Sequence, residues 1–146
     1  MMSCKLTAGL CAATTILAAQ LAFSQPALAQ APPIPARTPL AVVPIAPAKA
    51  VARVETNRVD FAPGQEMPAH KHTVPVICFV AKGAFRTRIG DAPERTAPEG
   101  SVTYEPPGVT VHYFRNASAS APAQLQCASL AGAGDKELNV MLPPGS

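Results

Sequence analysis

The sequence predicts an all-β fold, a single small barrel or sandwich. After Ala50, apolar and polar residues alternate with the period of two that is typical of strands. Glycine and proline interrupt this alternation at short intervals, and no stretch carries a sustained apolar stripe at helical spacing. Many short strands separated by turns are typical of a closed barrel or a sandwich.

Seven strands are expected, each bounded by turn residues. The expected ranges are 52–61, 68–73, 75–81, 85–89, 101–105, 110–116 and 124–130. Between them stand turn-forming residues, at Pro63-Gly64, Lys82-Gly83, Gly90-Asp91, Pro107-Gly108 and 116–122. These strands lie in one domain, expected over 38–131, which is long enough to bury one modest core. The apolar segment 40–45 is expected to lie along the barrel as an edge segment.

The N-terminal segment, residues 1–29, has the pattern of a secretory signal. A short basic start with Lys5 precedes the mainly apolar stretch 6–23, and Ala27-Leu28-Ala29 offers the small-x-small pattern of a cleavage site. A membrane anchor is the alternative, but Gln20 interrupts an apolar stretch that is already short for a span. We therefore expect removal after Ala29 and a periplasmic or secreted mature protein.

Two further segments flank the expected domain. Residues 30–37 form a proline-rich leader, which favours extended chain. Residues 132–146 are rich in glycine and proline and are expected to form a C-terminal tail.

The 12 Lys and Arg residues and 9 Asp and Glu residues are scattered without a basic run, and aromatic residues are few. This pattern excludes the usual footprint of a nucleic-acid binder, and no membrane contact is expected after signal removal.

The three histidines are the candidates for a metal site. His70 and His72 stand two residues apart, so in a strand both imidazoles point to one face. His112 lies near the start of another expected strand and could add a third nitrogen across the barrel. Three imidazoles with open positions would form a catalytic metal site. Alternatively, all three are ordinary strand and core residues, because His-x-His alone is a weak pattern.

The residues around His70 resemble the first motif of the cupin family. That motif runs Gly, five residues, His-x-His, three or four residues, Glu, six residues, Gly. Gly64, His70, His72 and Gly83 stand at matching spacings, and Val76 occupies the position of the glutamate.

A second stretch resembles the second cupin motif, which runs Gly, five residues, Pro-x-Gly, two residues, His, three residues, Asn. Gly100, the turn Pro106-Pro107-Gly108, His112 and Asn116 follow this order, with three residues instead of two before the histidine. Two motifs in the right order form a specific pattern, and the resemblance covers residues 38–131.

Resemblance to the cupin family implies a double-stranded β-helix, or jelly-roll barrel, in a small single-domain bacterial protein. We expect His70, His72 and His112 to bind a divalent ion, Fe, Mn, Ni or Zn. The implied function is that of a metal-dependent enzyme of the dioxygenase, isomerase or lyase type, acting on a small oxygen-rich molecule. The alternatives are a non-enzymatic barrel that binds a metal or a small ligand, and a partner-binding scaffold without a metal. A homodimer is one possible assembly.

Two departures from the motifs affect the site. Without the usual glutamate at Val76, a carboxylate could come from Glu105 or Glu66, and we name Glu105 as the candidate catalytic residue, although it could also be a turn residue. The extra residue before His112 leaves open whether Val111 or His112 faces inward, because a slip of one residue moves a side chain to the other face. The spacing from His112 to Asn116 favours His112.

The cysteines leave one alternative open. Export would remove Cys4 and Cys11 with the signal and would leave Cys78 and Cys127 in an oxidising compartment. These two residues could form a disulfide or remain two buried thiols, because the sequence does not give their separation.

Overall fold

The computed structural model describes residues 35–143 of the 146-residue chain. The expected signal peptide, 1–29, and most of the leader lie outside the described residues, as do the last three residues. A compact unit begins at Arg37. Within residues 35–143, no helix is long and apolar enough to cross a membrane.

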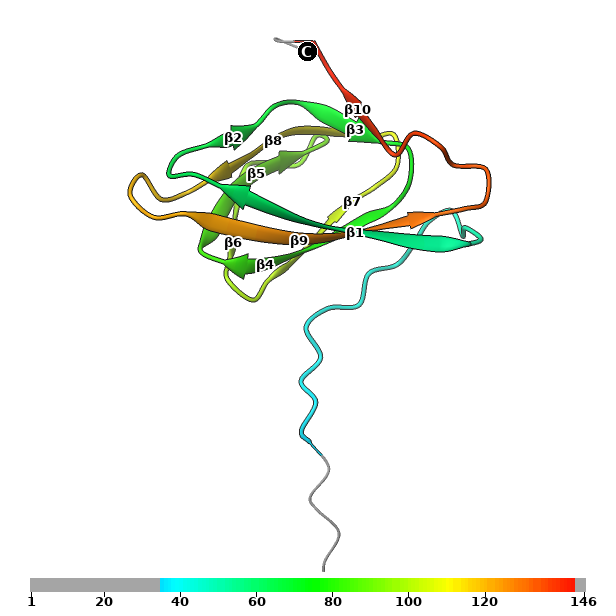
Figure 1. Cartoon of the computed structure of the whole chain (residues 1–146), viewed down its shortest axis with the longest axis horizontal. Helices are drawn as coiled ribbons and strands as arrows, with labels where there is room; N and C mark the ends of the chain where they lie inside the picture. The colour runs from blue at the N-terminus through cyan, green and yellow to red at the C-terminus, as the bar shows by residue number, and fades with distance from the viewer. Residues whose placement is uncertain (1–34, 144–146) are drawn as a thin grey trace, which may run out of the picture. The chain divides into compact units, whose positions relative to one another are not determined.

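The described residues form ten strands in two antiparallel sheets (Figure 1). The smaller sheet has the order β1-β9-β4-β7, and the larger has the order β10-β3-β8-β5-β6, with β2 also paired to β8. The strands are β1 (Arg53–Phe61), β2 (Glu66–Met67), β3 (His70–His72), β4 (Val76–Lys82), β5 (Ala84–Ile89), β6 (Arg95–Pro98), β7 (Val102–Glu105), β8 (Thr110–Asn116), β9 (Ala123–Ala131) and β10 (Asn139–Met141). The all-β jelly-roll prediction is confirmed.

The seven expected strands are all present, with ends that differ by two residues at most. The short strands β2, β6 and β10 were not expected. Strand β10 lies in the expected C-terminal tail, 132–146, yet it pairs with β3, with Asn139 opposite His72 and Met141 opposite His70. The segment 40–45 forms no strand; Leu40 and Val42 are exposed, whereas Val43 and Ile45 are partly buried.

The inward-facing apolar residues of the two sheets form the core. Phe85 is fully buried, and its ring packs edge-on against Phe61 and Phe114, with centroids 4.9 Å and 6.0 Å away. Val80 and Leu125 complete the centre of this cluster. Burial of each such side chain stabilises the fold by about 1.5–3 kcal/mol. A smaller cluster of Val74, Val76 and Cys78 packs at the start of β4.

Cys78 and Cys127 form a disulfide across the smaller sheet. They stand directly opposite each other on β4 and β9, with an S–S bond of 2.06 Å and a sequence separation of 49 residues. The structure therefore decides between the two alternatives that the sequence left open, in favour of the bridge.

Candidate metal centre

The two histidines of β3 point into the barrel from the larger sheet. Strand β3 lies between β8 and β10, and the residues at both of its ends share one face because Cβ directions alternate along a strand. His70 is buried and His72 is partly buried, and their rings meet edge to face with centroids 5.0 Å apart. The expectation that both imidazoles enter one space is confirmed.

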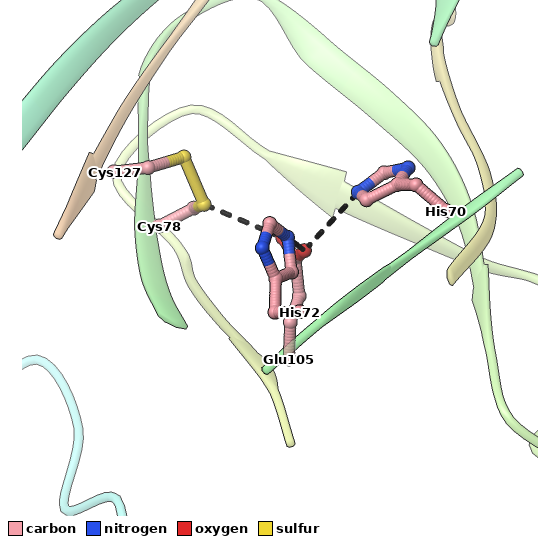
Figure 2. Close-up of a disulfide and its surroundings, with 5 residues drawn as sticks. All are labelled: His70, His72, Cys78, Glu105 and Cys127. Atoms are coloured by element: carbon pink, nitrogen blue, oxygen red, sulfur yellow. Dashed lines mark hydrogen bonds and ion pairs between the residues drawn. A yellow bond between two sulfur atoms is a disulfide. The ribbon is translucent and has the colours of Figure 1, made fainter. Parts of the chain in front are cut away.

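Glu105 supplies a carboxylate from the opposite sheet. It is the last residue of β7 and stands opposite Val76 of β4, so both side chains point to the inner face. Its side chain is buried, and Glu105 Oε2 lies 2.7 Å from His72 Nε2 and 3.6 Å from His70 Nε2 (Figure 2). Of the two carboxylates that the sequence offered, Glu105 is the one at the site. Glu66 lies on the surface, where its carboxylate is 3.8 Å from Arg115 Nη1.

Backbone carbonyls fix the orientation of both imidazoles. His70 Nδ1 lies 2.8 Å from the Pro68 carbonyl and His72 Nδ1 lies 3.3 Å from the Leu138 carbonyl, so each Nδ1–H can donate to a carbonyl oxygen. The two Nε2 atoms are thereby directed at Glu105. Leu138 directly precedes β10, and Thr73 Oγ1 donates to the Glu137 carbonyl beside it. The C-terminal segment thus helps to hold His72.

The electrostatics of the group favour a charged pair. Burial opposes the imidazolium of His70, but hydrogen bonds to Glu105 and to the Pro68 carbonyl outweigh this effect, and the pKa of His70 is raised. Burial likewise opposes the carboxylate of Glu105, but hydrogen bonds to His70 and His72 outweigh it, and the pKa of Glu105 is lowered. Glu105 is therefore an anion at neutral pH, as a metal ligand must be.

The three side chains fit a divalent ion. The ligand atoms of His70, His72 and Glu105 all lie within 4.8 Å of one another, and this is the only such group of three among residues 35–143. Atoms bonded to one ion at about 2.1 Å stand roughly 3.0–3.4 Å apart in octahedral or tetrahedral geometry, so small shifts would close the set. Two nitrogens and one oxygen suit Fe, Mn, Ni or Zn.

The structure does not bring His112 into this group. In β8, Tyr113 pairs with Arg88 and Val111 pairs with Ile89, so His112 is the extra residue of a β-bulge. Val111 is fully buried and stands opposite His70, whereas His112 is only partly buried.

The bulge explains the extra residue in the second motif. Two residues separate Gly108 from Val111, so by its distance from the turn Val111 takes the motif position of the histidine. Three residues separate His112 from Asn116, so by its distance from the asparagine His112 takes that position. Because the bulge takes up the extra residue between them, both ends of the motif keep their places. Asn116 stays buried and donates to the Ala62 and Ala121 carbonyls. Among the described residues, the structure therefore groups His70 and His72 with Glu105 as candidate ligands and leaves His112 outside that group.

A cavity of about 220 Å³ adjoins the three side chains. Residues of both sheets line it, and Val76 is at its wall, as are both cysteines of the disulfide. Cys78 Sγ lies 3.4 Å from Glu105 Oε1, so the bridge packs directly against the carboxylate (Figure 2). A small molecule in this cavity would therefore reach an ion held by the three side chains.

Comparison with models of protein families assigns the barrel to a family. A family model described as a cupin domain matches residues 57–129, which is half of the chain. The chain belongs to the cupin family. The resemblance predicted from the two motifs is thus confirmed. A search of curated proteins finds no match for this cupin.

Solved structures share the fold of this cupin. An oxalate oxidase in complex with the substrate analogue glycolate is 26% identical with a TM-score of 0.54, and the alignment covers 62% of this chain and 46% of that one. The DMSP lyase DddQ from Ruegeria pomeroyi DSS-3 is 17% identical with a TM-score of 0.53, covering 64% and 45%. Oxalate decarboxylase from Bacillus subtilis is 17% identical with a TM-score of 0.53, covering 61% and 24%. This cupin therefore spans less than half the length of each.

Proposed function

We propose that this cupin is a metal-dependent enzyme of the dioxygenase, isomerase or lyase type that acts on a small oxygen-containing molecule. The observation that carries the proposal is the convergence of His70 Nε2, His72 Nε2 and Glu105 Oε2 at the wall of a partly open cavity. Donors directed at one point, buried and open to a cavity on one side, are what a catalytic metal site requires.

The number of donors favours catalysis over a purely structural ion. Structural zinc sites are closed by four protein ligands, whereas catalytic sites keep at least one position for substrate. Val76 and Val111, both buried on the inner face, offer no donor. A set of two histidines and one carboxylate with open positions is typical of non-haem Fe(II) oxygenases. Fe(II) and dioxygenase chemistry are therefore the leading choice.

The roles of the chain's own residues follow from the geometry. A divalent ion bound here would supply Lewis acidity toward a substrate oxygen. His70 and His72 hold their Nε2 lone pairs toward the site because each Nδ1 proton is engaged by a carbonyl. Glu105 holds Oε2 toward the imidazoles, and its Oε1 packs against the sulfur of Cys78.

A non-enzymatic metal-binding or ligand-binding barrel is the second candidate. It is favoured by the two valines, because both stand where the cupin motifs place a metal ligand. In this case the ion or the small molecule would be bound and released without turnover.

Metal analysis of untagged protein tests the proposal. We expect one divalent ion per chain, lost in His70→Ala, His72→Ala and Glu105→Ala with the β-sheet circular dichroism retained, since barrel closure depends on backbone pairing and apolar burial. His112→Ala is the matched control and should keep the ion. Full retention of metal in the first three variants would contradict the site.

Oxygen consumption separates the two candidate functions. Protein loaded with Fe(II) should consume oxygen in the presence of at least one member of a panel of small molecules that chelate metals through oxygen atoms. The Glu105→Ala variant should not consume oxygen with any of them. Stoichiometric metal combined with no turnover of any panel compound would favour the binding barrel.

A further inference from the structure

The wall of the cavity is predominantly apolar away from the three metal-site side chains. Besides the two cysteines, seven apolar residues line it, from β1, β2, β4, β8, β9 and the segment before β10: Val59, Phe61, Met67, Val76, Phe114, Leu125 and Leu138. A buried apolar cavity of about 150 Å³ holds a benzene molecule, and this cavity is larger, at about 220 Å³. It has room for an apolar group of aromatic size.

None of the described residues that line the cavity is a lysine or an arginine. Its two carboxylates are Glu105 and Glu55, and Glu55 is exposed and 2.7 Å from Arg53 Nε, which is itself outside the cavity lining. The other polar side chains at the wall, those of Asn57, Ser129 and Asn139, are neutral. No fixed cation is therefore available to receive an anionic group away from the ion.

The charge of the site sets the charge of its ligand. A divalent ion and the Glu105 carboxylate sum to one positive charge, because the two histidines are neutral when they bind a metal. A monoanionic ligand neutralises this charge. A dianion would leave one negative charge beside a mainly apolar wall that offers no cation to pair with it, which is unfavourable.

We infer that the ligand of this site is a monoanionic chelator with two oxygen donors and an uncharged apolar body, and not a compact dianion such as oxalate. The inference rests on the proposed metal site and adds the substrate class. The head of the ligand binds the ion, and the body occupies the space between Phe114, Leu125 and Met67.

Three probes test the inference on the Co(II)-loaded protein by calorimetry, after metal loading has been measured. Benzohydroxamate and acetohydroxamate carry the same chelating head and differ in a phenyl and a methyl body, and oxalate is the dianion. We expect benzohydroxamate to bind at least tenfold more tightly than acetohydroxamate, which is about 1.4 kcal/mol, and oxalate to bind most weakly. Oxalate binding as tight as that of benzohydroxamate, or no gain from the phenyl group, would overturn the inference.

A charge placed in the wall provides a second test. Met67 of β2 is only partly buried and stands opposite Phe114 of β8, so Met67→Arg introduces a cation at the cavity without emptying the core. We expect this variant to shift the preference toward oxalate by about tenfold. Val140→Arg, on the exposed face of β10, is the control and should leave the preference unchanged. A shift of equal size in both variants would contradict the inference.

Failure to bind Co(II) at all would instead contradict the proposed function, because loading precedes every ligand measurement.

Discussion

At the residue scale, the candidate site has its carboxylate on the strand next to the one that carries the motif position of the glutamate. The first cupin motif places a glutamate where this chain has Val76, and Glu105 stands directly opposite that valine on β7. Opposed residues of an antiparallel pair point to the same face with Cβ atoms about 5 Å apart. A carboxylate can therefore reach the same space from either strand, and Glu105 offers the candidate site an anionic oxygen although the motif residue is absent.

Restoring the motif residue should strengthen metal binding. Val76→Glu adds a second anionic oxygen on the face that Glu105 already occupies, so metal affinity should rise by at least tenfold. The metal-free variant should be less stable than the wild type, because two carboxylates would then be buried side by side. Calorimetric titration with Zn(II) or Mn(II) measures the affinity. Ile77→Glu, on the other face of β4, is the control and should have no effect; unchanged affinity in Val76→Glu would show that residue 76 does not face the ion.

The stability of the metal-free protein should depend on pH through His70 and Glu105. The pKa of His70 is raised from 6.5, so its contribution is complete below pH 6.5 and is lost as pH rises through the folded-state value. The pKa of Glu105 is lowered from 4.5, so its contribution is complete above pH 4.5 and is lost as pH falls through the folded-state value. Both contributions are therefore present together between pH 4.5 and 6.5.

Urea denaturation of chelator-treated protein measures this dependence. Glu105→Gln should lower the free energy of unfolding by about 2 kcal/mol in that window, since it removes charged hydrogen bonds to two histidines. The difference between wild type and variant should shrink toward pH 3 and toward pH 9. A difference that is constant across the whole range would show that the pair is not charged in the folded protein.

At the element scale, the C-terminal segment belongs to the site. Strand β10 pairs with β3 along the whole length of the His70–His72 strand, and the Leu138 carbonyl just before it faces His72 Nδ1. The segment therefore covers an otherwise open sheet edge and orients His72, one of the candidate ligands. Partners of this kind typically change metal affinity by 10–100-fold when they are removed.

Truncation tests this role of the C-terminal segment. A chain ending at Lys136 lacks Leu138 and β10, and its metal affinity should fall by about 10–100-fold while His70 and His72 are both still present. A chain ending at Pro143 keeps the strand and is the control, with metal affinity equal to that of the full chain. Isothermal titration with the same ion compares the two. Equal affinity in both truncated chains would remove the C-terminal segment from the site.

At the scale of the whole molecule, the disulfide bears on where the protein works. Cys78 and Cys127 are bridged in the barrel, and disulfides persist mainly in oxidising compartments. Together with the signal pattern of residues 1–29, this supports the proposal that the chain is exported.

Intact-mass measurement of material from the periplasmic fraction tests export. We expect a chain that begins at Gln30, because Ala27-Leu28-Ala29 precedes it. The same spectrum should show a loss of two hydrogens relative to the reduced mature chain. A mass that includes Met1, found only in the cytoplasmic fraction, would contradict the proposal.

The sequence by itself determined the fold class, the positions of seven strands and the placement of His70 and His72 on the same face of one strand. These features are local, because alternation, turn residues and i, i+2 spacing are properties of neighbouring residues. Only the tertiary structure decided three other features. Glu105 joins the histidines through strand pairing across a sheet, Val111 displaces His112 through a β-bulge, and β10 returns to cover β3. Each depends on which residues stand opposite one another on strands distant in sequence, and the spacing of residues along one chain does not specify that register.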